Sequence, residues 1–434
     1  MAKVLVVGGY GLIGLAIVKK LLDAGHSVRG IGRDASQAEV QEPGARWDSV
    51  DISRLHTAEQ WVPYSDSADV IINASGALQS GQKDDLKALQ CRSITALIDS
   101  CRKGANSPKY IQISAPGADW DAKFEFLRTK GEADDYLRQS GLDWCILKPG
   151  LVIAPAAYGG TALLRMLASF PFVTPLVYPD SPVGTISIDD VVDVVMAAID
   201  GRVPPGTEMD IVEEHARPLS EVVGLFRSWM GLSRPALTLR LPSWIARVVG
   251  FGADILGELG WRSPLRSTSM KVMSEGVIAD PTVYKQVMQK SCKSLPETLR
   301  GMPSTVQERW FARMFLLFPA MIATLSLFWI ASGVIGFLKV SAAATHLTDA
   351  GIGQSLAMAV VAAGAFVDIV LGAAVVYRPY VRPALLGMVA VTASYLVAGS
   401  LLSPSLWLDP LGPFVKTLPA SVMAFVASAF VRSR

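Results

Sequence analysis

The chain changes character near residue 314, and this change limits its fold more than any other feature of the sequence. Between residues 314 and 434 only nine side chains carry a formal charge, and long apolar runs fill the gaps between them. Each run is long enough to cross a hydrocarbon core of about 30 Å as a helix. We therefore expect an all-α four-helix transmembrane domain over residues 314–434, with spans at about 314–338, 354–377, 383–402 and 414–431.

The composition agrees with a membrane protein and excludes several other classes. A mean hydropathy of +0.36, with 51% hydrophobic residues, is too apolar for a purely soluble chain of 434 residues. The formal net charge of +2 and the absence of long charged blocks predict no nucleic-acid partner. The four cysteines have no metal-ligand spacing, so we expect free thiols and no metal site; they are Cys91, Cys101, Cys145 and Cys292.

Basic residues at the ends of the expected spans predict the orientation in the membrane. One side carries Arg309, Arg313, Arg378, Arg382, Arg432 and Arg434, whereas the other carries Lys339 and Lys416. Because cytoplasmic loops are enriched in Lys and Arg, the side of both termini is the inside. The first residues also lack the cleavage pattern of a signal peptide. We expect a multi-pass protein of the cytoplasmic (inner) membrane, with its N-terminal domain and its C-terminus in the cytoplasm.

Asp368 lies inside the second expected span, where an ionisable side chain is a candidate for function. The alternative is a carboxyl group that only forms a hydrogen bond to a neighbouring helix. Lys416 is a poor partner for it, because this lysine lies near the outer end of its own span.

The clearest local motif is "KVLVVGGYGLIGLAIVKKLLDAG" at the start of the chain. The apolar run ending at Val7 predicts a buried strand, glycines follow at intervals of three residues, and helical periodicity comes next. Glycines allow a tight turn, a close approach of the backbone to a pyrophosphate, and amides at a helix N-terminus that face the anion. We predict a dinucleotide site that includes Gly8, Gly11, Leu12, Ile13 and Gly14.

The end of the second expected strand, "SVRGIGR", favours NADP over NAD. An NAD site places a carboxylate at this position to bind the ribose hydroxyls, whereas an NADP site places an arginine there to bind the 2′-phosphate. The sequence has Gly32 followed by Arg33. Arg29 lies on the same strand, and Asp34 could repel the phosphate or contact the ribose, so NAD stays possible.

Three further expected strands bring more residues to the same edge of the sheet. Asp51 follows the third strand and is placed to meet the adenine, and the fourth ends in Ala74, Ser75 and Gly76. The fifth, "KYIQI", ends before Ser114. Because strands alternate with helical stretches, we expect an α/β doubly wound Rossmann domain over residues 1–200. A small mixed substrate-side or connecting region should occupy residues 201–313.

Ser114, Lys130 and "ILKPG" at 146–150 together resemble the short-chain dehydrogenase/reductase superfamily, in its extended or atypical branch. In active members of this family a serine orients the substrate carbonyl, a tyrosine donates the proton, and a lysine four residues later binds the nicotinamide ribose. The resemblance implies these roles for Ser114 and Lys130. The tyrosine is replaced by Phe126, which has no proton to give.

Tyr158 is the candidate for a substitute acid, because it precedes two glycines in a region where this superfamily lines its substrate cleft. The alternative is a tyrosine of a surface loop. In "TISIDDVVDVVMAAI", residues 185–199, we expect a strand and a helix with Asp189 as the helix cap.

The stretch "PSWIARVVGFGADILGEL" has apolar residues at helical spacing and allows two interpretations. The favoured one is a helix that packs over the substrate cleft. The alternative is a helix on the membrane surface, beside Arg240, Arg247 and Arg262.

The segment "SLWLDPLGPFVKTLP" resembles the last loop and helix start of the DoxX-like membrane family. The pattern consists of Trp407, Asp409, Pro410, Gly412 and Lys416. The resemblance covers about the last 120 residues and implies a four-helix module, without settling its biochemical role.

Two functions follow from these features. The first is a membrane-anchored NAD(P)-dependent oxidoreductase of the short-chain dehydrogenase/reductase type, which acts on a small lipophilic substrate. The second is a catalytically silent NADP-binding redox sensor, or an assembly factor for a membrane protein complex, and Phe126 favours it. Both require contact with membrane lipid.

Overall fold

The computed structural model describes residues 1–77, 85–104, 106–233, 235, 237–261, 263–410 and 412–431. The chain folds into two compact units. The first comprises Met1–Asp254 and Ser263–Ala312, and the second comprises Ile255–Arg262 and Arg313–Arg434. Three of the arginines named above, Arg262, Arg432 and Arg434, lie outside the described residues.

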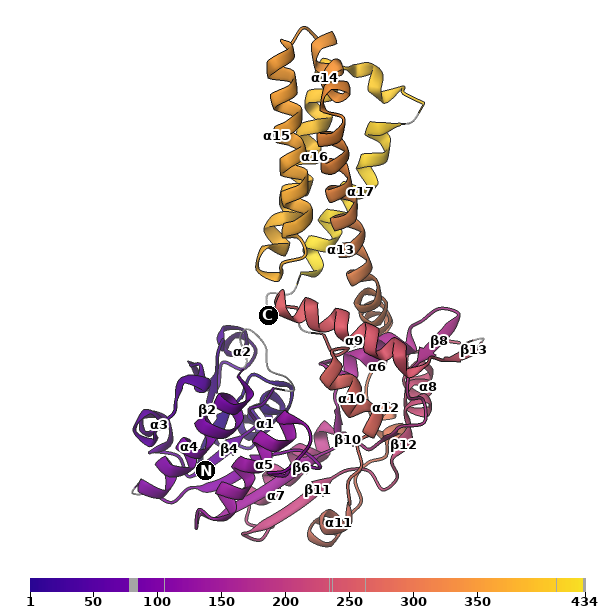
Figure 1. Cartoon of the computed structure of the whole chain (residues 1–434). Helices are drawn as coiled ribbons and strands as arrows, with labels where there is room; N and C mark the ends of the chain where they lie inside the picture. The colour runs from indigo at the N-terminus through magenta and orange to yellow at the C-terminus, as the bar shows by residue number, and fades with distance from the viewer. Residues whose placement is uncertain are drawn as a thin grey trace. The chain divides into compact units, whose positions relative to one another are not determined.

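The centre of the first unit is a seven-stranded sheet in the order β11-β6-β5-β4-β1-β2-β3 (Figure 1). Its strands are β1 (Lys3–Val7), β2 (Ser27–Gly32), β3 (Arg46–Ser49), β4 (Val70–Asn73), β5 (Lys109–Ile113), β6 (Trp144–Pro149) and β11 (Thr207–Ile211). Every neighbouring pair is parallel. The strand order reverses beside β1, and ligands of open α/β sheets bind at the carboxyl ends of the strands at such a point. This sheet confirms the predicted doubly wound fold.

Helices cover both faces of the sheet. They are α1 (Leu12–Asp23) and α7 (Ile188–Ile199) on one face, and α3 (Ala58–Ser65), α4 (Ser93–Lys103) and α5 (Glu125–Arg138) on the other. Ile17 and Leu21 of α1 are fully buried against the first face, and Leu97 and Leu137 against the second. Each such side chain contributes about 1.5–3 kcal/mol through burial.

The start of α7 differs from the prediction. The cap is Ser187, whose hydroxyl accepts from the backbone amide of Asp189 at 3.2 Å. The strand β10 (Thr185–Ser187) runs directly into the helix, so Asp189 lies in the first turn and the prediction that it caps the helix was wrong.

A smaller core of the first unit is formed by residues that follow β6 in the chain. Phe226 and Met230 are fully buried there, together with Leu176 and Leu295. The other elements before α13 are α2 (Ser36–Gln41), η1 (Ile52–Arg54), η2 (Lys87–Arg92), β7 (Leu151–Ile153), α6 (Gly160–Ala168), β8 (Val173–Leu176), β9 (Pro182–Val183), β12 (Arg217–Pro218), α8 (Leu219–Trp229), β13 (Leu237–Arg240), α9 (Ser243–Glu258), α10 (Ser267–Glu275), α11 (Thr282–Met288) and α12 (Leu295–Gly301).

The second unit is built from long apolar helices that run side by side (Figure 1). They are α13 (Val306–Leu338), α15 (Gln354–Ala374), α16 (Val381–Leu402) and α17 (Pro413–Phe430), with the shorter α14 (Val340–Asp349), η3 (Arg378–Tyr380) and η4 (Pro404–Trp407) between them. Within the described residues four helices are long and apolar enough to cross a membrane, and the third of these candidate spans, Arg378–Leu402, includes η3. This architecture confirms the predicted four-helix class.

Glycines bring α13 and α15 into close contact. A Cβ atom on Gly372 would lie 2.9 Å from the backbone nitrogen of Ile330, and one on Gly333 would lie 2.4 Å from the carbonyl oxygen of Ala365. The Ser326 hydroxyl donates to the Gly372 carbonyl at 2.7 Å. Such small residues replace the hydrophobic effect as the means of helix association in lipid.

Asp368 is buried among three of these helices. Its carboxyl group accepts hydrogen bonds from Ser332 of α13 at 2.9 Å and from Tyr395 of α16 at 3.1 Å. The ring of Tyr395 reaches it because a glycine, Gly364, lies where a Cβ atom would be 2.8 Å from the tyrosine oxygen. The structure thus gives Asp368 the hydrogen bonds to neighbouring helices that were its alternative interpretation.

Candidate cofactor site

The turn after β1 is shaped by two glycines that no other residue could replace without movement of the backbone. Gly8 has φ +75°, and a Cβ atom there would lie 2.8 Å from the backbone nitrogen of Ser75. A Cβ atom on Gly14 would lie 2.2 Å from the carbonyl oxygen of Gly8. The start of α1 therefore rests directly on the turn. Its first amides, at Leu12 and Ile13, have no partner within the helix and are available to an anion.

A hydrogen-bonded wall stands beside this turn at the end of β4. The Asn73 side chain accepts from the Ser75 amide at 3.1 Å and the Ser75 hydroxyl at 2.6 Å, and it donates to Gln112 of β5 at 2.9 Å. The Ala74 amide donates to the carbonyl oxygen of Val7 at 2.9 Å. Ala74 and Ser75 are thereby fixed next to the glycine turn, as the predicted order of the strands requires.

Lys130 of α5 reaches the same edge of the sheet. Its ammonium group donates to the carbonyl oxygen of Ile113, the last residue of β5, at 2.8 Å. A Cβ atom on Gly76 would lie 3.6 Å from Lys130 Nζ. Burial lowers the pKa of Lys130, and the charge of nearby Asp134 opposes that shift. The structure thus brings together Gly76, Lys130 and the end of β5.

Ser114 follows β5 and is hydrogen-bonded to an acid that the sequence analysis missed. Its hydroxyl donates to Asp134 Oδ2, while Asp134 Oδ1 has no partner among the described residues. Asp134 is fully buried, and this burial raises its pKa to about 6. The charged or titratable groups around it are Lys130 and Arg138 of the same helix, Lys148 of β6 and Tyr110 of β5. The available signal was its spacing of four residues from Lys130, which places both on one helix face.

Phe126 and Tyr158 have no described side-chain hydrogen bond to the group formed by Ser114, Lys130 and Asp134. Phe126 is 8% exposed and belongs to a small apolar core with Leu86 and Phe124. Tyr158 is 53% exposed in the loop before α6, and its described hydrogen bonds are made by its backbone to Thr161. No hydrogen bond among the described residues connects the Tyr158 hydroxyl to the other predicted catalytic groups.

The space beside the end of β2 is filled by the ring of Tyr10, which lies between the glycines of the turn. A Cβ atom on Gly32, at the end of β2, would lie 1.9 Å from Cδ1 of the Tyr10 ring. No side chain, and hence no carboxylate, fits at position 32 with this ring in place. Arg29 is held elsewhere, because it donates to Asp48 at 2.5 Å and to the carbonyl oxygen of Pro63 at 2.6 Å.

Arg33 and two acids follow at this end of the site. Arg33 is half-buried directly after β2. Asp34 accepts from the amide and the hydroxyl of Ser36, which lowers the pKa of Asp34. Asp51 begins η1 and accepts from the amide and hydroxyl of Ser53 at 3.2 and 2.7 Å. Both acids are thus engaged with a serine two residues later in the chain.

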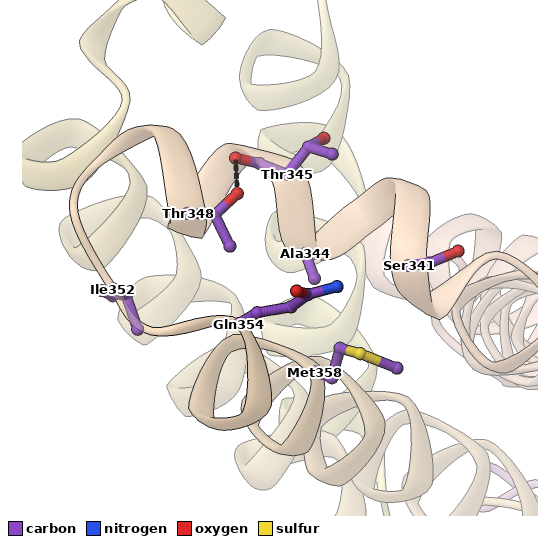
Figure 2. Close-up of a pocket in the computed structure, with 7 residues that line it drawn as sticks. All are labelled: Ser341, Ala344, Thr345, Thr348, Ile352, Gln354 and Met358. Atoms are coloured by element: carbon purple, nitrogen blue, oxygen red, sulfur yellow. Dashed lines mark hydrogen bonds between the residues drawn. The ribbon is translucent and has the colours of Figure 1, made fainter.

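Two hollows of the second unit are lined by described residues. One, of about 380 Å³, is lined by Ser341, Ala344, Thr345, Thr348, Ile352, Gln354 and Met358 (Figure 2). The Thr348 hydroxyl donates a hydrogen bond to the carbonyl oxygen of Thr345 there. The other, of about 390 Å³, is lined by Leu396, Val397, Ser400, Leu401 and Trp407. Neither lining contains an ionisable side chain, so neither supplies an acid or a base for catalysis.

Family models match both parts of the chain. The NAD(P)H-binding family matches residues 8–201, and the DoxX-like family matches residues 326–425. The chain therefore joins an NAD(P)-binding Rossmann domain to a DoxX-like domain. The glycine turn described above provides the cradle that a nicotinamide dinucleotide requires.

Solved structures show the same fold at low sequence identity. UDP-glucose 4-epimerase of Thermotoga maritima is 16% identical with a TM-score of 0.52, over 69% of this chain and 96% of the epimerase. The enzyme WbmG of Bordetella bronchiseptica, in complex with NAD and UDP, is 13% identical with a TM-score of 0.53, over 73% of this chain and 97% of WbmG. At these identities the likeness shows the fold alone.

Curated relatives match about half of the chain or less. The mitochondrial protein fmp52 of Aspergillus fumigatus is 27% identical over 224 residues, which are 48% of this chain and 93% of fmp52. The photosystem II assembly factor Ycf39 of Cyanophora paradoxa is 28% identical over 146 residues, which are 33% of this chain and 44% of Ycf39.

Proposed function

We propose that this chain is a membrane-anchored, NADP-dependent oxidoreductase of the short-chain dehydrogenase/reductase type that acts on a small lipophilic molecule. The observation that carries the proposal is the position of Lys130, whose ammonium group is fixed to the end of β5 beside Gly76. A lysine at this edge is placed to hold the nicotinamide ribose. When bound, the cofactor supplies the hydride.

The preference for NADP rests on the closed end of β2. With the Tyr10 ring over Gly32, the carboxylate typical of an NAD site has no room there. Arg33 is the next residue and has the guanidinium group that suits a 2′-phosphate. We assign Arg33 this contact and Asp51 a place beside the adenine.

The proton in the reaction has a candidate source in Ser114 and Asp134. When Asp134 is a carboxylate, it accepts a hydrogen bond from the Ser114 hydroxyl, so this hydroxyl cannot donate to a substrate. A protonated Asp134 instead donates to Ser114 Oγ, so that the Ser114 proton can move to a substrate carbonyl oxygen. Asp134 then replaces the proton of Ser114 and is left as a carboxylate, which regains a proton from solvent. A pKa of about 6 keeps a fraction of Asp134 protonated near neutral pH.

The membrane unit supports the choice of a lipophilic substrate. Four candidate spans hold the chain at a bilayer, where a substrate dissolved in lipid is concentrated. We place the protein in the cytoplasmic membrane with the cofactor domain and both termini inside, because basic residues flank that side of the spans.

One observation favours a second function, a catalytically silent NADP-binding sensor or an assembly factor for a membrane complex. Phe126 fills an apolar core at the position where the family has its tyrosine, so the usual acid is absent there. Ycf39, one of the relatives, is itself an assembly factor. In this case the site binds cofactor and does not turn over.

The test is turnover of NADPH by the full chain in lipid nanodiscs, with short enones and quinones as acceptors. We expect NADPH oxidation that falls strongly in Asp134→Asn. The control is Tyr136→Phe, which should leave the rate unchanged because the Tyr136 hydroxyl donates a hydrogen bond to Asp99 of α4, away from Ser114. Loss of activity in Tyr158→Phe would instead make that tyrosine the acid. Binding of NADPH without turnover in the wild type and in Phe126→Tyr would favour the sensor.

A further inference from the structure

The helix α9 (Ser243–Glu258) presents its large apolar side chains outward. Its small residues are buried, with Ala246 at 2% and Ala253 at 7% exposure. The large apolar side chains exposed between Ser243 and Asp254 are Trp244 at 56%, Val248 at 62%, Val249 at 39% and Phe251 at 67%. This is the reverse of a helix on the surface of a soluble protein, which turns its large apolar residues to the core.

Three of the exposed residues form one stripe. Trp244, Val248 and Phe251 are separated by four and three residues, so they lie on the same face of the helix. The opposite face is packed tightly, because a Cβ atom on Gly250 would lie 3.1 Å from the backbone of Ser267 at the start of α10. Scattered apolar residues on a surface are ordinary, but a continuous stripe marks a site of interaction.

The chain itself fixes how far this stripe can be from the membrane spans. After Asp254 the chain enters the second unit. There the Leu259 carbonyl accepts from the Arg378 amide at 2.9 Å, and the Trp261 ring donates to the Val376 carbonyl at 2.5 Å. Val376 lies in the short link between the second and third spans, and this link is at one face of the membrane.

The length of α9 sets the remaining distance. An α-helix rises 1.5 Å per residue, so Trp244 is within about 17 Å of Ile255 along the helix axis, and Phe251 is within about 6 Å. Ile255 is the first residue of the second unit, four residues before the anchored Leu259. The chain is therefore short enough for the stripe to reach the headgroup layer.

We propose that α9 lies in the interface of the bilayer, with Trp244, Val248 and Phe251 in contact with lipid acyl chains. Trp is enriched at the level of the headgroups, and apolar faces of interfacial helices insert a few ångströms into the lipid. Arg247 is exposed beside the stripe and can extend to lipid phosphates. The proposal takes up the membrane-surface helix that the sequence left as its alternative.

The experiment uses nitroxide labels on single introduced cysteines in the full chain in nanodiscs. Phe251→Cys and Val248→Cys report on the stripe, and Val40→Cys is the matched control because Val40 is 82% exposed on α2. Labelled protein without an introduced cysteine gives the background of the native thiols. Collisions with oxygen, which dissolves in lipid, and with a water-soluble nickel complex are measured by electron paramagnetic resonance.

We expect the labels at 248 and 251 to collide more with oxygen than with the nickel complex, and the label at Val40 to show the opposite ratio. A nickel collision rate at the stripe as high as at Val40 would place the stripe in water and overturn the proposal. Low rates for both reagents would show a protein contact, such as a second copy of the chain, and would overturn it as well. Neither result depends on the proposed enzymatic activity.

Discussion

Replacing Gly14 by alanine tests the geometry on which cofactor binding depends. A Cβ atom at this position would be 2.2 Å from the carbonyl oxygen of Gly8 and 2.8 Å from the Cα atom of Gly9. Both are backbone atoms, so no side chain can rotate away and the start of α1 must move. Forced packing of this kind typically destabilises a protein by about 1–3 kcal/mol.

Gly224 of α8 offers a matched control. It also lies inside a helix, but it is exposed and a Cβ atom there would meet nothing within 4 Å. Alanine is favoured over glycine inside a helix by about 1 kcal/mol. We therefore expect Gly224→Ala to raise the free energy of unfolding by about 0.5–1 kcal/mol, and Gly14→Ala to lower it by as much as about 2 kcal/mol after the same gain is included.

The binding of NADPH should separate the two variants further. Movement of α1 withdraws its first amides from the pyrophosphate, and losing one hydrogen bond to a charged group costs about 1.5–3 kcal/mol, or about 10- to 150-fold in affinity. Calorimetric titration of the full chain in detergent measures this loss, and thermal unfolding measures stability. Wild-type affinity in Gly14→Ala, with unfolding at or above the wild-type temperature, would refute the close approach of the helix to the turn.

Three further predictions concern single side chains. Arg33→Ala should weaken NADPH binding by about 10- to 100-fold and leave NADH binding unchanged, and equal losses for both cofactors would contradict its contact with the 2′-phosphate. Because burial raises the pKa of Asp134 from 3.8 to about 6, the folded state keeps a proton that the unfolded state has released, and the free energy of unfolding falls as pH rises through this range. Asp134→Asn should remove this contribution, so the stability of the variant relative to wild type should rise by about 2 kcal/mol between pH 4 and 7, as measured by denaturant titration. Asp368→Leu should destabilise the protein in nanodiscs by about 1 kcal/mol more than Asp368→Asn, because only asparagine keeps partners for Ser332 and Tyr395.

The sequence was informative wherever a structural feature depends on residues close together in the chain. The run before Gly8 predicted β1, and the long apolar runs predicted the four spans, because strand and helix patterns repeat over a few residues. The role of Ser114 as a hydrogen-bond donor to Asp134 was not predicted. These two residues are 20 positions apart, and only the packing of α5 on β5 brings them together.

The same limit explains the other omissions. The ring of Tyr10 over Gly32 depends on the side chain of one segment filling the space above another, which no local pattern records. For α9, the sequence showed apolar residues at helical spacing but not which face is buried. Amphipathic spacing identifies a helix, whereas its direction relative to the core depends on its neighbours.

The short segment Ile255–Arg262 belongs to the second unit although it lies within the sequence of the first, so the two units are not fused end to end. This arrangement affects the order in which contacts can form during synthesis. The chain passes between the units three times, so a proteolytic cut before α13 leaves Ile255–Arg262 covalently attached to the first unit while its hydrogen bonds at Leu259 and Trp261 hold it in the second. Trp261 leaves the ribosome 115 residues ahead of Val376, its hydrogen-bond partner. The chain of the first unit is thus interrupted by a segment of the second unit, and the hydrogen-bond partner of that segment at Val376 is synthesised only later.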